Sequence, residues 1–242
     1  MSVKTEAIVL NKIKYGDSSF IVNLYSLEYG RFATIIKIPK NKKNNNSVNR
    51  NLFFPLNIIE TEVELKNTRN VQTVKYCGRK MVLNFIANDI FKSCIAQFIA
   101  EVILKTVKEE EPHENLYMFF KETISLLEKT ENSSAVHLLF LKEFAKISGF
   151  GMTNNFCKET PYFNYVEGMF LPVFTYNEMS LEIPESKVLS GLLELSYDNL
   201  EEFKISYILR KRILEIFLRY YELHILGKHE IKSLKILNEV FG

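Results

Sequence analysis

The 242-residue chain contains no tryptophan, only three cysteines, and no stretch of about eighteen apolar residues. Cys77, Cys94 and Cys157 are few, odd in number and far apart, so we expect free thiols in a reducing cytoplasm rather than a disulfide framework. The lack of a long apolar run excludes a predicted membrane span. The first residues also lack the uncharged apolar segment of a secretory signal. These absences favour a cytoplasmic protein with no membrane partner.

The short motifs that mark common catalytic sites are missing as well. The sequence has no P-loop, G-x-G-x-x-G, H-E-x-x-H or G-x-S-x-G pattern. His224 and His229 are five residues apart, which does not place them on one helix face, and no cysteine or acidic cluster accompanies them. Glu60, Glu62 and Glu64 alternate along one predicted strand, and a solvated face explains them better than acid/base catalysis does. We therefore expect no catalytic residue, no metal and no cofactor.

The charge that is present is divided unevenly along the chain. Residues 1–80 hold fourteen Lys and Arg against six Asp and Glu, whereas residues 81–242 hold seventeen against twenty-three. A small basic domain is a candidate for contact with a phosphate backbone, because Lys and Arg release condensed counterions there. The alternative is that the basic excess is only solvated surface.

The same basic segment has the pattern of short strands. Val, Ile and aromatic residues gather in five runs between turn residues, at 6–14, 20–26, 32–38, 56–65 and 71–77. The clearest alternation places Ile59, Thr61, Val63 and Leu65 on one face. Five short antiparallel-looking strands predict a small closed barrel, with an SH3-like barrel as the competing interpretation.

Residues 40–50, KNKKNNNSVNR, have no apolar period and are expected to form a loop between the third and fourth strands. Four of these residues are basic. The loop is either a finger that contacts phosphates or a solvated linker, and composition favours neither.

From residue 81 the apolar period becomes that of helices. Ile95, Phe98 and Val102 are part of one stripe with i, i+3 and i+4 spacing. Further stripes predict helices around 116–127, 136–147, 186–196, 203–225 and 231–241. In the long helix 203–225 we expect Ile208 to face inward. Residues 152–184 show no clear period. The change of period and of charge near 78–84 predicts a domain junction there.

The order of these pieces resembles the RecO family of bacterial DNA repair and recombination mediators, over nearly the full length. The resemblance lies in the opening strands and turns and in the closing helices: TEAIVL (5–10), YGDSS (15–19), IVNLYS (21–26), Gly30-Arg31, YYELH (220–224) and KSLKIL (232–237). It implies an α+β protein, with a five-stranded OB-fold barrel at 1–80 that binds DNA and an all-helical domain at 81–242.

The resemblance also implies a function. A RecO protein would bind single- and double-stranded DNA, anneal complementary strands after DNA damage, and help load RecA onto strands covered by single-strand binding protein, together with RecR. It would be cytoplasmic and associated with the nucleoid, and it would not be an enzyme. Many family members carry a four-cysteine zinc site, but here 154–173 offers only Cys157. We expect a zinc-less region at about 152–184, in which apolar packing replaces the metal: Phe156, Phe163, Phe170 and Leu171.

The expected DNA-binding residues are basic side chains of the barrel and its loop: Arg31, Lys37, Lys40, Lys42, Lys43, Arg50 and Arg69. Two alternatives remain open at this point. The chain could be a protein-interaction scaffold whose barrel has no direct role on DNA, or an enzyme with a dispersed active site.

Overall fold

The computed structural model describes residues 2–37, 50–64, 71–108, 112–176 and 179–241. The chain divides into two compact units, Met1–Glu128 and Lys129–Gly242, and each unit is described by itself. No helix among the described residues is long and apolar enough to cross a membrane.

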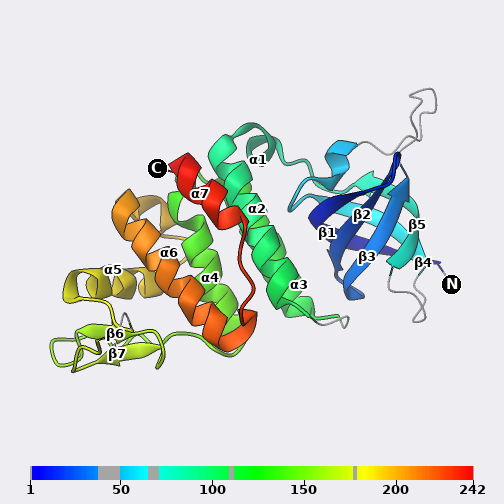
Figure 1. The fold of residues 1–242 in the computed structure, drawn as a ribbon. Coiled ribbons are helices and arrows are strands. Elements are labelled where there is room, and N and C mark those ends of the chain that lie inside the picture. Colours follow the sequence, from blue (N-terminus) through cyan, green and yellow to red (C-terminus); the bar gives the residue numbers. More distant parts are fainter. Residues whose placement is uncertain (1, 38–49, 65–70, 109–111, 177–178, 242) are drawn as a thin grey trace. The chain divides into compact units, whose positions relative to one another are not determined.

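The first unit begins with a closed five-stranded barrel (Figure 1). Its strands are β1 (Ser2–Tyr15), β2 (Ser19–Ser26), β3 (Gly30–Lys37), β4 (Ile58–Glu64) and β5 (Val71–Arg79). They are hydrogen-bonded in the order β1-β2-β3-β5-β4, and β4 pairs back onto β1. The predicted closed barrel is thereby confirmed.

Local sequence explains the turns and the inner face of this barrel. Gly16 and Gly30 take positive φ angles of 72° and 62° at the ends of the first two hairpins, a conformation that costs glycine little. On β4, Ile59 and Val63 are fully buried whereas Glu60 is exposed, as the alternation predicted. Leu65, the last member of that predicted face, lies outside the described residues.

β1 is long, and different parts of it pair with its two neighbours. Its first half pairs with β4 and most of its length pairs with β2, and the register against β2 shifts between Val9 and Asn11. A bulge of this kind bends a strand, which helps the sheet to close. The barrel is completed by a short parallel ladder between β3 and β5, from Ala33↔Val71 to Ile35↔Thr73.

Three helices belong to the same compact unit as the barrel: α1 (Asn84–Asn88), α2 (Ile90–Thr106) and α3 (Glu114–Lys129, whose last residue starts the second unit). Tyr25 of β2 stacks on Tyr117 at 6.3 Å between ring centroids and meets Phe120 edge-on at 5.3 Å. Arg31 of β3 donates to the carbonyl of Leu104 at 2.7 Å. The strands end at Arg79 and the first helix begins at Asn84, whereas the compact unit extends to Glu128. The predicted junction at 78–84 stays a prediction.

Glu128 organises the start of the helices. Its carboxylate accepts backbone N–H bonds from Asn84, Phe85 and Ile86 at 2.7 to 2.9 Å. The first amides of a helix have no partner within the helix, and a carboxylate there also meets the positive end of the helix dipole. Its own carbonyl accepts from the buried Lys92 ammonium at 2.9 Å. One side chain thus fastens the end of α3 to the start of α1.

The second unit is mainly helical, as expected. Its helices and strands follow in the order η2 (Ser133–Ala135), α4 (Val136–Ile147), β6 (Tyr162–Asn164), β7 (Met169–Leu171), α5 (Ile183–Glu194), η3 (Leu200–Glu202), α6 (Tyr207–Tyr221), the π-helical turn η4 (Glu222–Leu226) and α7 (Ser233–Phe241). Figure 1 shows the β6–β7 hairpin beside α5. The sequence did not reveal this hairpin, because strands of three residues are too short to show a period.

One expectation for the long helix is wrong. Ile208 is 78% exposed, and Arg210 is buried in its place. The guanidinium of Arg210 lies 4.4 Å from the ring centroid of Phe241 and 5.6 Å from that of Tyr207, and such cation–π contacts offset part of its desolvation. α6 begins at Tyr207 rather than 203, because the Ser206 side chain accepts from the Leu209 amide as an N-cap.

Candidate nucleic-acid interface

The outer side of β1, β2 and β3 forms the surface that we call the three-strand face. The strand register places Tyr15 opposite Ser19, and Ser19 opposite Lys37, in one row across the strands. The next row of the same side is apolar, and the face consists of Ile13, Tyr15, Ser19, Ile21, Ile35 and Lys37. Residues that alternate with it, such as Val22 and Ile36, point into the barrel and are buried.

This face offers the two kinds of group that bind single-stranded nucleic acid, an aromatic ring and a positive charge. The Tyr15 ring is 57% exposed, and Lys37 is exposed two strands away in the same row. Aromatic rings stack on bases whatever their sequence, while ammonium groups contact phosphates. Paired strands lie about 4.8 Å apart, which separates the two residues by about 10 Å at the backbone. A single strand can therefore use both residues at once.

Lys12 alternates with the face: it pairs with Val22 and so lies on the opposite side of β1, and it was not among the predicted residues. Its Nζ atom is 5.7 Å from the ring centroid of Phe20 and 5.5 Å from that of Phe54. Phe54 is 52% exposed and follows the short helix η1 (Arg50–Phe53). Sequence reasoning missed this group because Lys12 and Phe54 are more than forty residues apart, and only the barrel brings them together.

The residues that the sequence did nominate are distributed as follows. Lys37 lies on the three-strand face. Arg31 is half-buried, and its bond to Leu104 gives it a structural role in the first unit as well. Arg50 is the first residue of η1. The other four lie outside the described residues: Lys40, Lys42, Lys43 and Arg69. Their contact with DNA stays a prediction.

Two further lysines near the barrel, Lys80 and Lys121, form ion pairs with the carboxylate of Glu6. Glu6 of β1 accepts from Lys121 at 2.7 Å and from the Tyr117 hydroxyl at 2.8 Å, and Lys80 lies 3.9 Å away. Burial raises the pKa of Glu6, but the hydrogen bonds from Lys121 and Tyr117 and the nearby positive charges outweigh it, so the pKa lies below its ordinary value. Lys80 and Lys121 therefore add less to the positive surface than their number suggests.

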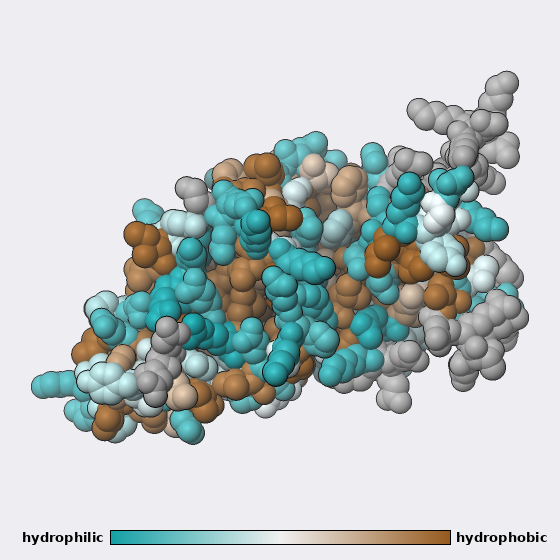
Figure 2. Space-filling model, viewed as in Figure 1, coloured by the Kyte–Doolittle hydropathy of each residue, from teal (hydrophilic) through white to brown (hydrophobic). Residues whose placement is uncertain are grey.

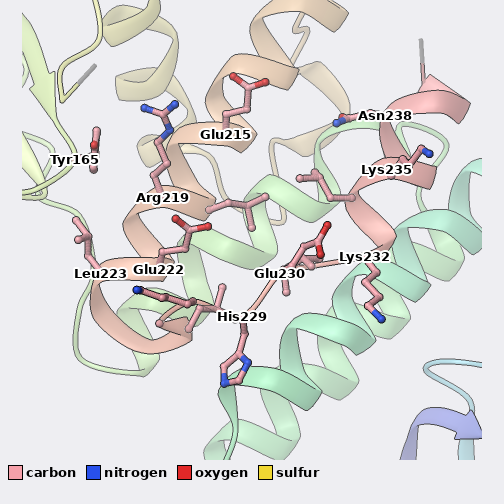
Figure 3. Close-up of a pocket in the computed structure, with 16 residues that line it drawn as sticks. Tyr165, Glu215, Arg219, Glu222, Leu223, His229, Glu230, Lys232, Lys235 and Asn238 are labelled. Carbon is pink, nitrogen blue, oxygen red and sulfur yellow. The ribbon is translucent and has the colours of Figure 1, made fainter. Parts of the chain in front are cut away.

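The second unit contains a hollow of about 1010 Å³ around the π-helical turn (Figure 3). Apolar residues such as Leu218 and Leu223 line it together with side chains of both charges. Figure 3 shows these charged side chains extending from α6, from the π-helical turn and from the residues before and within α7: Glu215, Arg219, Glu222, Glu230, Lys232 and Lys235. A hollow of mixed charge suits a protein segment better than a uniformly negative phosphate backbone.

The region expected to lack zinc contains an aromatic cluster. Phe163 and Phe170 face each other edge-on at 5.1 Å in the β6–β7 hairpin, and Phe156 meets Phe170 at 5.3 Å. Cys157 is exposed and hydrogen-bonded to Thr160. Within the described residues, no three His, Cys, Asp or Glu side chains gather closely enough to hold a metal ion. A tetrahedral zinc site needs four donors, so this donor set does not fit zinc.

Two further ionisable side chains, His137 and Cys77, are buried in the interior of the protein. Burial and the Arg210 charge lower the pKa of His137 to about 3, so this imidazole is neutral, and it is 1% exposed. Burial raises the pKa of the Cys77 thiol, which keeps it protonated. Neither group lies open to a substrate.

A closed barrel of this strand order, with a ligand-sized face on β1 to β3 and a helical extension, defines an OB-fold protein. Comparison with known sequences identifies its family. Residues 1–78 match the model described as Recombination protein O N terminal, and residues 87–235 match Recombination protein O C terminal. The chain belongs to the RecO family of DNA repair proteins.

Curated relatives agree over the full length. The chain is 33% identical over 242 residues to the DNA repair protein RecO of Azobacteroides pseudotrichonymphae genomovar. CFP2. It is 30% identical to that of Phocaeicola vulgatus over 243 residues and 31% identical to that of Flavobacterium psychrophilum over 245 residues. In each case 100% of both chains is covered. The predicted resemblance is confirmed.

Proposed function

We propose that this protein binds single- and double-stranded DNA through its barrel, anneals complementary strands, and helps to load RecA onto strands covered by single-strand binding protein, together with RecR. The observation that carries the proposal is the three-strand face, where an exposed aromatic ring and an exposed lysine share one row of a basic barrel. We place this activity in the cytoplasm, at the nucleoid.

The mechanism requires no covalent chemistry. Lysines neutralise part of the charge of a bound strand, which lowers its repulsion towards a second strand. Stacking on Tyr15 holds the first strand without reading its sequence, so any complementary partner can pair with it. We therefore propose a binding protein rather than an enzyme.

The test is a salt titration of the intact protein with a labelled single strand. The logarithm of affinity should fall against the logarithm of salt with a slope near −0.7 for each phosphate neutralised. Lys37→Ala should make this slope shallower by about one such unit, because it removes one contact. Lys187→Ala is the matched control, since it removes an exposed lysine from α5 in the second unit. A slope near zero in the unaltered protein contradicts the proposal.

The predicted basic segment has its own test. A variant in which four basic residues become alanine should anneal complementary oligonucleotides more slowly at unchanged thermal stability: Lys40, Lys42, Lys43 and Arg50. Surface changes of this kind usually alter stability by less than about 0.5 kcal/mol. Unchanged annealing would show that these residues do not contact DNA.

A scaffold function is the second candidate, and the hollow of the second unit favours it. Its apolar lining and mixed charge would accept a segment of another protein. The salt titration separates the two candidates, because a scaffold whose barrel is only structural has no salt-dependent affinity for a single strand.

A further inference from the structure

A small pocket lies in the first unit, beside the Lys12–Phe54 pair described above. Its volume is about 160 Å³, and it is formed by the turn before β4, by α1 and by α2: Phe54, Pro55, Asn57, Ile86, Ala87, Ser93, Ala96 and Gln97. Drug-sized ligands occupy roughly 300 Å³ or more, so this pocket is on the scale of a single ring system. We call it the Phe54 pocket. In Figure 2, hydrophobic patches interrupt the hydrophilic surface of the barrel as well as that of the helices.

The Phe54 pocket has apolar walls and three polar side chains, of which Ser93 donates its hydroxyl to the Ile86 carbonyl. Ile86 and Ala96 are buried, and the Phe54 ring is half-exposed. The Asn57 amide nitrogen donates to the carbonyls of Asn51 and Leu52, which fixes the side chain and leaves its oxygen as an acceptor. Gln97 is exposed, and its side chain has no hydrogen-bond partner among the described residues. An apolar pocket of this size with two amide side chains can accept a nucleobase.

The turn that presents Phe54 and Asn57 is held rigidly. The backbone N–H of Asn57 donates to the backbone carbonyl of Phe54 at 3.1 Å, which closes a turn over Pro55 and Leu56. Within this turn Leu56 has a positive φ of 65°. This conformation favours glycine, so leucine there is strained. The strain is offset because Leu56 is fully buried and because the turn exchanges two hydrogen bonds with Val9, beside the bulge of β1. Phe54 and Asn57 are therefore positioned before any ligand arrives.

We propose that the Phe54 pocket takes up one unstacked base of a single DNA strand bound to the barrel. The inference rests on the proposed function, because the barrel must first hold the strand. Lys12 supplies a positive charge beside the pocket: its ammonium lies over the rings of both Phe20 and Phe54, on the side of β1 opposite the three-strand face. A phosphate near Lys12 would place the adjoining base against Phe54. The negative phosphates of the strand and the excess of basic residues in the barrel are complementary in charge.

The experiment compares two single strands of equal length, one with ordinary bases and one with abasic sites throughout, bound to the intact protein. Both carry the same phosphates, so their difference in affinity measures contacts to bases alone. We expect Phe54→Ala to weaken binding of the ordinary strand by about tenfold, the scale of one lost stacking contact. Binding of the abasic strand should not change, which also shows that the variant is folded. Gln97→Leu should act in the same direction with a smaller effect.

Phe85→Ala is the matched control, because Phe85 is an exposed phenylalanine of α1, 64% accessible, that does not line the pocket. It should leave both affinities unchanged. Equal loss for both strands in Phe54→Ala, or no loss for either, overturns the inference. If the unaltered protein prefers the ordinary strand with steep salt dependence and Phe54→Ala keeps that preference, the pocket inference fails while the proposed function stands. If the unaltered protein binds both strands equally, the pocket inference fails together with the stacking on Tyr15. If it binds neither strand, both fail.

Discussion

Replacing Glu6 by glutamine should loosen the attachment of α3 to the barrel. Glu6 accepts a hydrogen bond from the Tyr117 hydroxyl, and a bond to a charged group contributes about 1.5–3 kcal/mol. Lys121 is 40% exposed, so its ion pair adds only about 0.2–1 kcal/mol. Glutamine keeps an acceptor oxygen but loses the charge. We expect the free energy of unfolding of the first unit to fall by about 1–2 kcal/mol at pH 7.

The effect has a defined pH dependence. The folded pKa of Glu6 lies below its ordinary value, so its charge stabilises the fold above that ordinary value and the contribution disappears as pH falls through the folded pKa. The difference between Glu6→Gln and the unaltered protein should thus be constant near neutrality and vanish in acid. Hydrogen exchange of amides in β1 and α3 measures it within the intact chain.

Glu60→Gln is the control for that experiment, because Glu60 lies opposite Glu6 on β4, is exposed, and has no ion pair among the described residues. It changes the charge of the barrel by the same amount and should alter stability by less than about 0.5 kcal/mol. The reasoning is refuted if Glu6→Gln behaves like Glu60→Gln at pH 7, or if its deficit grows as the pH is lowered.

Three further outcomes are expected. Glu128→Ala should lower the free energy of unfolding of the first unit by about 3 kcal/mol in urea titrations, since it leaves three helix amides without an acceptor, and Glu128→Gln should cost less. Leu56→Gly should destabilise by about 2 kcal/mol in the same assay, because the lost burial exceeds the relief of backbone strain; a stabilised variant would contradict this balance. Elemental analysis of the purified protein should find far less than one zinc per chain, and a stoichiometric amount would reveal a ligand set that Cys157 alone does not provide.

Features with a local period could be predicted from the sequence. The alternation of Ile59, Thr61 and Val63 located β4, because side-chain direction in a strand follows directly from sequence spacing. The stripe of α2, which includes Ile95 and Phe98, was likewise found buried. Family resemblance then supplied the barrel type, since strand runs alone did not separate an OB fold from an SH3-like barrel.

Features that depend on distant partners could not be predicted. Arg210 is buried although it is charged, because a ring 31 residues later, Phe241, receives its guanidinium. Likewise, charge composition pointed to the barrel, but Phe54 and Gln97 meet only because α2 folds back beside the turn before β4. The residue types in the sequence pointed to the basic barrel as the candidate surface. Which side chains lie together on it could be seen only in the tertiary structure.

The parallel ladder between β3 and β5 has a consequence for the folding pathway. The three residue pairs of this ladder, starting at Ala33↔Val71, join strands that are separated by β4 in the sequence. The β1–β2 and β2–β3 hairpins instead pair strands that follow each other directly in the sequence. Local pairings form first, because loop closure must be completed before a distant ladder gains hydrogen bonds. Two ladders join strands that are distant in sequence, β1–β4 with seven residue pairs and β3–β5 with three, and both should form after the hairpins. The β3–β5 ladder, which has fewer pairs, should open first.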